Sequence, residues 1–117
     1  MASVLMRLEQ LEAQNAIRNC INRYMEICDA LDADTDLNEL MGLFDRHSIW
    51  EGIGEKYSRS FGQFESWQAI YDMFKSYTQK ESHFVLNAHF VSSEQIDING
   101  HEATGRWLML QLSLIHI

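Results

Sequence analysis

The sequence lacks several features that would assign it to large classes of protein. Its 117 residues hold nine Lys and Arg against seventeen Asp and Glu, a net charge of −8, and no basic run occurs. Because duplex nucleic acid and anionic membrane surfaces are bound by clustered cations, we expect neither as a partner. No apolar stretch approaches the length of a membrane span, and the N-terminus lacks the basic-then-apolar pattern of a signal peptide.

Cysteine is scarce. The only two, Cys20 and Cys28, fall on one predicted helix, about 12 Å apart along its axis. A disulfide needs Cα atoms within about 7 Å, so the two cannot be bridged. They are predicted to be reduced, buried thiols, which favours a cytoplasmic location.

Motifs for metals, phosphates and serine nucleophiles are missing as well. The five histidines show no pair at the spacing of a helical metal site, and no Cys-x-x-Cys occurs. Gly52 and Gly54 lack the strand–helix context of a phosphate loop, and neither Ser58 nor Ser60 has the flanking glycines of a nucleophile elbow. The sequence therefore predicts neither a metal nor a cofactor.

The length fits one domain, and the apolar spacing predicts helices first and a strand meander last. Helices are expected at 4–31, 37–44 and 65–78, and strands at 48–51, 57–61, from 83 to a polar bend at 92–94, 96–98 and 103–110. Asn99-Gly100 lies between the last two strands as a hairpin turn. This order predicts an α+β fold with helices on one face of a curved antiparallel sheet.

The stretch from Ser82 to Phe90 organises the chain. Apolar residues alternate there with His83, Val85, Asn87 and His89, which is the period of a strand. Three hydrogen-bonding side chains on one face predict a sheet that lines a polar pocket.

A strand of this kind after a helix with Tyr24-x4-Asp29-x2-Asp32 resembles the SnoaL-like and scytalone-dehydratase-like branch of the nuclear-transport-factor-two-like superfamily. The resemblance covers about residues 8 to 111. It implies a cone-shaped sheet wrapped by three helices. It also implies a lyase or isomerase without a cofactor, which removes a proton next to a carbonyl of a small hydrophobic, oxygenated substrate.

The resemblance also implies site residues. His83 would be the general base, because imidazole exchanges protons near neutral pH, and Asp29 would orient it. Tyr24 and Asn87 would be polar contacts of the substrate. Three aromatic residues complete the pocket: Phe44, Trp50 and Trp107.

The residues themselves leave alternatives open. On an unbroken helix Asp29 lies about 140° from Tyr24, toward solvent or a flank, and Asp32 is then the fallback partner. Without the resemblance, His83 is more often a satisfied polar residue, and the aromatic rings are more often ordinary core.

The chain also departs from the scytalone dehydratase pattern at three positions. Cys28 and Glu51 stand where that enzyme has pocket tyrosines, and Trp107 stands where it has a second pocket histidine. A mechanism with two histidines and two tyrosines cannot be transferred, and one predicted base survives.

Two other readings compete with the enzyme. The apolar strand face of Phe84, Leu86, Ala88 and Phe90 favours a non-catalytic binding or dimerisation module. A homodimer through this sheet face fits the enzyme and the module alike. The third reading is a small subunit of a ring-hydroxylating dioxygenase, although such subunits are usually longer.

The six residues Leu112–Ile117 resemble the translation of a sequencing-transposon adapter end. We therefore predict a domain at 1–111 and a non-native tail at 112–117, so that the fold is truncated by a strand or two. A genuine C-terminal strand is the alternative.

Overall fold

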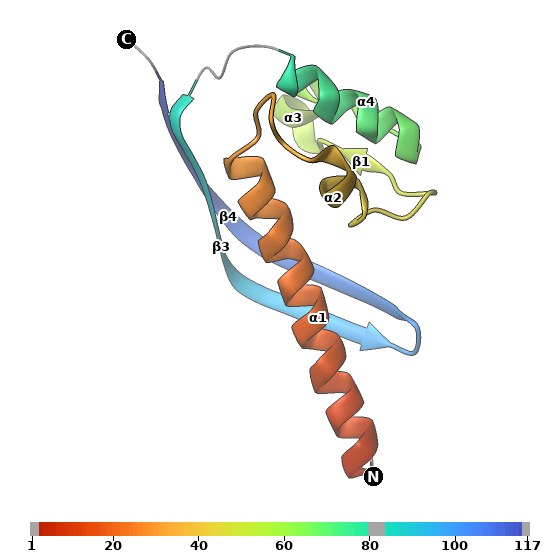
Figure 1. Cartoon of the computed structure of the whole chain (residues 1–117). Coiled ribbons are helices and arrows are strands. Elements are labelled where there is room, and N and C mark those ends of the chain that lie inside the picture. Colours follow the sequence, from red (N-terminus) through yellow and green to blue (C-terminus); the bar gives the residue numbers. More distant parts are fainter. Residues whose placement is uncertain (1–2, 80–83, 116–117) are drawn as a thin grey trace. The chain divides into compact units, whose positions relative to one another are not determined.

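A computed structural model describes residues 3–79 and 84–115, and its chain divides into two compact units. The first unit combines residues 1–29 with 83–117, and the second comprises residues 30–82. The α+β class is confirmed, since helices and antiparallel strands occur together (Figure 1). In chain order the elements are α1 (Val4–Asp29), α2 (Leu37–Met41), β1 (Trp50–Glu51), α3 (Gly54–Ser60), β2 (Gln63–Phe64), α4 (Trp67–Thr78), β3 (Phe84–Asn99) and β4 (Glu102–Ile115).

The first unit is a long hairpin of β3 and β4 with α1 packed against β3 (Figure 1). Asn99 and Glu102 close the hairpin around Gly100, whose φ of +63° is the left-handed conformation that glycine adopts without steric cost. The predicted Asn99-Gly100 turn is therefore confirmed. The hairpin pairs through the expected bend as one continuous strand on each side.

A bulge at the predicted bend reverses which residues of β3 face α1. The pairing shifts between Ser92 and Gln95, and Ser93 has a positive φ of 53°. Before the bulge Asn87, His89 and Val91 are partly covered, and after it the covered positions are even-numbered: Glu94, Ile96 and Ile98. Because strand side chains alternate, one extra residue moves the inward set by one position.

The bulge brings Glu94 under α1, where it holds the helix to the hairpin. Arg18 donates from Nε and Nη2 to both carboxylate oxygens, at 2.8–3.1 Å. The indole N–H of Trp107 donates to Oε1 of the same carboxylate at 3.1 Å. Hydrogen bonding from Arg18 lowers the pKa of Glu94, and Glu94 in turn raises the pKa of Arg18.

The second unit has a small core between α2 and α4. Leu40, Met41 and Ile70 are fully buried there, and Phe74 closes the core beside the rings of Phe44 and Trp50. Both helices begin at side-chain caps, since Asp36 accepts from the Asn38 N–H and Ser66 from the Ala69 N–H. The sequence predicts Asp36 or Thr35 as the cap of α2, and the structure has Asp36 there. Tyr77 falls at the helical spacing of the apolar residues of α4 but is half exposed.

The strand predicted at 57–61 is wrong, because residues 54–60 form helix α3. Tyr57 and Phe61 stack with their ring centroids 5.9 Å apart, and Glu55 pairs with Arg59 at 3.2 Å. Both pairs are four residues apart, a spacing at which helical side chains meet. Local contacts thus override the β-preference of the aromatic residues.

The described strands form two two-stranded antiparallel sheets, β1–β2 and β3–β4, instead of the one sheet expected, and four helices occur instead of three. With residues 54–60 helical, the second strand moves to Gln63–Phe64. It pairs with β1 through only two residues on each side.

Buried Ile70 tests the core of the second unit. We expect Ile70→Ala to lower the free energy of unfolding by about 2–5 kcal/mol, since it leaves a cavity at a fully buried position. The matched Ile53→Ala, at a side chain that is 73% exposed, should change it by less than about 1 kcal/mol. Urea unfolding of both variants measures the difference, and equal losses would contradict this core.

Glu94 tests the attachment of α1. A carboxyl whose pKa is lowered in the folded state stabilises it above the ordinary value of about 4.3, and this contribution is lost as the pH falls. Glu94→Gln should therefore lose less stability than the parent protein between about pH 7 and pH 3. Urea unfolding at several pH values measures the slopes. Glu102→Gln, at an exposed glutamate of β4, is the control and should keep the parental slope.

Candidate functional site

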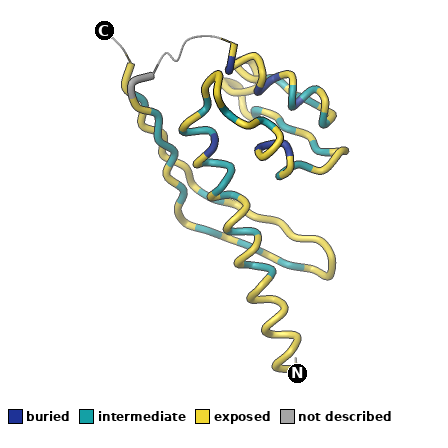
Figure 2. The backbone as a smooth tube through the Cα atoms, viewed as in Figure 1, coloured by how far each residue is buried: buried dark blue, intermediate teal, exposed yellow. Residues whose placement is uncertain are grey.

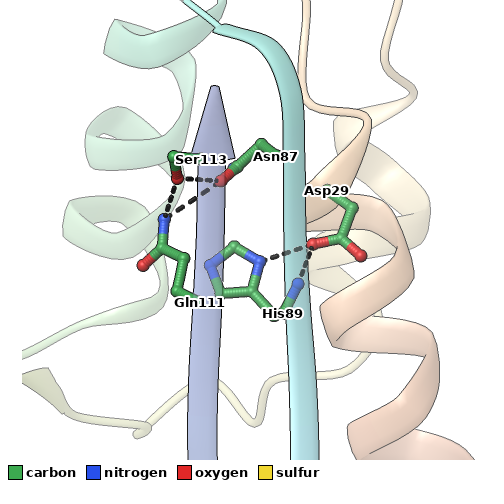
Figure 3. Close-up of polar contacts among 5 residues, drawn as sticks. All are labelled: Asp29, Asn87, His89, Gln111 and Ser113. Atoms are coloured by element: carbon green, nitrogen blue, oxygen red, sulfur yellow. Dashed lines mark hydrogen bonds and ion pairs between the residues drawn. The ribbon is translucent and has the colours of Figure 1, made fainter. Parts of the chain in front are cut away.

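The end of α1 meets β3 through an aspartate–histidine pair (Figure 3). Oδ1 of Asp29 lies 2.5 Å from Nδ1 of His89 and also accepts the backbone N–H of His89 at 2.8 Å. The pair is mostly covered, since the side chain of His89 is 13% exposed and that of Asp29 is 30% exposed. Two contacts to one oxygen hold the carboxylate and the ring in a single arrangement.

This geometry assigns the two nitrogens of the His89 ring. A carboxylate accepts the hydrogen of Nδ1, so the neutral ring carries its proton there and its lone pair on Nε2. Figure 3 shows Nε2 on the side of the ring away from Asp29, toward Gln111. No described residue makes a hydrogen bond to Nε2. An orienting carboxylate on one nitrogen and a lone pair on the other are what a general base requires.

Polar residues continue from His89 along the same face of the hairpin. His89 pairs across the strands with Gln111, and Asn87 pairs with Ser113. Oδ1 of Asn87 accepts from Nε2 of Gln111 at 3.0 Å and from the hydroxyl of Ser113 at 2.8 Å (Figure 3). With its oxygen engaged twice, the amide of Asn87 turns its Nδ2 donor away from these two partners. Ser113 belongs to the segment predicted as a non-native tail, whereas Asn87 and His89 precede that segment.

Cys28 precedes Asp29 and is a neutral thiol. Burial raises its pKa to about 11, and a hydrogen bond from Tyr24, one turn earlier, opposes the shift without cancelling it. Near neutral pH Cys28 is therefore neither a nucleophile nor a base. Cys28 is partly covered, as the sequence predicts for both cysteines, whereas Cys20 is exposed and the prediction is wrong for it.

The predicted site residues fall in different places. His83 lies outside the described residues, so its pairing with Asp29 stays a prediction, and the carboxylate of Asp29 contacts His89. Asp32, the fallback partner, accepts the backbone N–H of Asp34 at 2.8 Å in the turn after α1.

The predicted aromatic residues also serve the fold. The indole N–H of Trp107 is bonded to Glu94. In the second unit Phe44 packs on Phe74 with ring centroids 6.1 Å apart, and Trp50 packs on Phe61 at 5.6 Å. Tyr24 belongs to the first unit. An aromatic pocket built from all four residues stays a prediction.

Sequence reasoning missed the role of His89. The alternation placed His89 on the polar face with His83 and Asn87, but the family pattern directed attention to His83. The angle between Tyr24 and Asp29 on α1 did indicate that Asp29 can reach β3. Tyr24 and Asp29, 140° apart, lie on the two flanks of the face of α1 that covers β3, so Asp29 reaches the strand from the side.

No group of three metal-ligating side chains occurs among residues 3–79 and 84–115. Within the same ranges no helix is long and apolar enough to cross a membrane. A shallow depression of about 540 Å³ in the second unit is lined by residues that include Asn38, Met41, Phe44, Arg46 and Trp67. It contains neither a histidine nor a carboxylate, so it offers no acid–base pair.

Comparison with protein families matches residues 9–115 to the SnoaL-like domain. The chain belongs to the SnoaL-like domain family. The match spans both units and covers the Asp29–His89 pair, and it confirms the family that the sequence pattern suggested. No curated protein and no solved structure matches the chain.

The reactivity of the two cysteines tests how well the residues next to the Asp29–His89 pair are covered. Iodoacetamide reacts with thiolates, so at about pH 8 Cys28 should be alkylated far more slowly than exposed Cys20. Raising the pH toward 11 should accelerate alkylation of Cys28, because its thiol then ionises. Peptide mass spectrometry of the folded protein measures both rates. Equal rates at pH 8, with unfolded protein as reference, would show that Cys28 is not covered.

Proposed function

We propose that this SnoaL-like protein is a lyase or isomerase without a cofactor, which removes a proton next to a carbonyl group. The Asp29–His89 pair carries the proposal. It joins a mostly covered imidazole, a carboxylate on one ring nitrogen, and a lone pair on the other. General bases of this kind contribute about 10²–10⁴-fold to the rate of a proton transfer.

The chemistry follows from the two nitrogens. Nε2 of His89 takes the proton from the carbon beside the carbonyl, and the C–H electron pair moves into an enolate. The imidazolium that forms is stabilised by the carboxylate of Asp29 at Nδ1. It then returns the proton to a β-hydroxyl that leaves as water, or to another carbon. The first outcome is a dehydration and the second an isomerisation, and neither consumes an oxidant.

Asn87 is the polar contact that suits the enolate oxygen. It lies two residues before His89 on the same strand face, so their Cα atoms are about 6.5–7 Å apart. A base, a C–C–O unit and a hydrogen-bond donor in a row need a separation of this order. The Nδ2 group of Asn87 would donate to the oxygen as its charge develops. A small, hydrophobic, oxygenated molecule stays the proposed substrate.

His83 stays a second candidate for the base, because the resemblance implies it. The two histidines make different predictions, and the experiment below compares them. The non-catalytic module is the alternative function. It is favoured by the outer face of the hairpin, where Leu86, Phe90 and Leu110 are exposed and 69% of Leu110 is accessible. The predicted homodimer through this face also stays a proposal.

Hydrogen–deuterium exchange tests the base without knowledge of the natural substrate. A panel of small enones and hydroxyketones in D2O is incubated with the protein, and proton NMR follows the α-hydrogens. His89→Ala should slow the catalysed exchange about 10²–10⁴-fold, and Asp29→Asn should slow it as well, because the imidazolium loses its counter-charge.

Exposed His47 and His101 supply matched controls, and their alanine variants should exchange at the parental rate. Exchange that survives in His89→Ala and disappears in His83→Ala would assign the base to residue 83. Absence of exchange over the whole panel, with parental protein shown to be folded, would favour the non-catalytic module.

A further inference from the structure

The first turns of α1 expose an apolar stripe that the hairpin of the same unit leaves uncovered. Every residue from Ser3 to Glu12 is exposed (Figure 2). Three apolar side chains in this stretch lie on one side of the helix at gaps of four and three residues: Val4, Leu8 and Leu11, with exposed fractions of 71%, 50% and 60%. Exposed apolar side chains at helical spacing are typical of a helix face that packs on another element, so an apolar partner is expected for this stripe.

The centre of the stripe lies about 120° around the helix from the partly covered apolar residues of the later turns. At about 100° per residue, Val4, Leu8 and Leu11 lie within about 60° of one another. Ile17, Ile21 and Cys28, which are partly covered, lie about 80–180° around the helix from them, whereas Arg18 and Asp29, which bond to β3, lie within about 20° of the angle of Leu11. Because all three stripe residues are exposed while β3 is packed on α1, a second element can contact them.

The spacing is that of a coiled-coil seam. With Leu8 at position a, Val4 and Leu11 occupy d positions and Asn15 occupies the next a position. A single asparagine at an a position specifies register and pairs with its own copy in a parallel dimer. Asn15 is exposed, and none of the described residues makes a hydrogen bond to its side chain.

The charges beside the seam suit a second copy of this chain. Arg7 occupies a g position and Glu12 the following e position, five residues later. In a parallel dimer these two positions face each other across the seam, so each copy's Arg7 meets the other copy's Glu12. Within one helix residues five apart do not face each other, so this pair has no intrachain role. An antiparallel dimer would bring like positions together and lose the attraction.

We propose that residues 4–15 of α1 pair in parallel with the same residues of a second copy. The seam spans about two heptads, fewer than the three to four typical of a self-sufficient coiled coil, so the dimer is weak and depends on concentration. This surface is separate from the outer face of the hairpin, and its test does not depend on catalysis.

Sedimentation velocity of the full chain over a wide concentration range tests the proposal. The parental protein should show a reversible dimer, and Leu8→Gln or Leu11→Gln should raise the dissociation constant at least about tenfold. Met6→Gln is the matched control. Met6 is also exposed, at 58%, but lies off the seam, so its dissociation constant should stay within about twofold of the parental value.

Charge reversal tests the parallel register. Arg7→Glu alone and Glu12→Arg alone should each weaken the dimer, and the double variant should restore it, because the pair reforms with its signs exchanged. Arg7→Glu favours the helix N-terminus by itself, so weakening cannot be ascribed to loss of helix. Circular dichroism checks that every variant keeps its helix content.

Three results would overturn the proposal. The first is a strict monomer at all concentrations, which would leave the stripe to the unit of residues 30–82 or to another protein. The second is a dimer lost in Leu110→Ser but unchanged in Leu8→Gln, which would assign it to the hairpin face. The third is absence of rescue in the double charge variant, which would exclude the parallel pairing.

Discussion

The first unit depends on two side-chain contacts that join α1 to β3. Helix and hairpin are joined at two places along β3, by Arg18 and Glu94 at the bulge and by Asp29 and His89 nearer the strand's beginning. Both contacts pair a side chain of the helix with one of the strand, and both are charged or can be. The contact at the bulge is a bidentate ion pair with an indole on the same carboxylate, an arrangement suited to holding geometry. The contact at Asp29 leaves one ring nitrogen without a partner among the described residues, an arrangement suited to moving a proton. The packing of α1 on β3 thus supplies both an ion pair that holds the helix and a candidate general base.

The sequence predicted the parts of the fold that repeat or turn locally. The long helix, a cap at Asp36 or Thr35, and the turn at Gly100 follow from periodicity and from single-residue backbone preferences. The segment at 54–60 did not follow, because aromatic residues four apart suit a helix or a strand equally until their neighbours are known. The alternation of apolar and polar residues also did not predict that the strand faces reverse at Ser92 and Ser93. A bulge shows only as a polar bend in the sequence, yet it decides that Glu94, Ile96 and Ile98 point inward.

The sequence predicted the residue types of the site and the strand that carries them, but not which histidine contacts Asp29. The alternation put His83, Asn87 and His89 on one face, and the first helix supplied an aspartate. Which histidine that aspartate contacts depends on the position of α1 along β3. Tertiary contacts such as that of Arg18 with Glu94 set this position. The family match to the SnoaL-like domain supports the type of chemistry, and it does not choose between the histidines. Asp29 lies 140° from Tyr24 on α1, yet it contacts β3, because the two residues lie on opposite flanks of the helix face that covers the strand.

The proton on the His89 ring gives the most direct test of this account. Nitrogen-15 NMR distinguishes the two neutral tautomers of an imidazole and its cation, and it can be applied to the folded protein without any substrate. Neutral His89 should carry its hydrogen on Nδ1, and Asp29→Asn should alter this preference while the signals of His47 and His101 stay unchanged. A His89 ring that carries its hydrogen on Nε2, or that does not respond to Asp29→Asn, would contradict the dyad and with it the proposed chemistry.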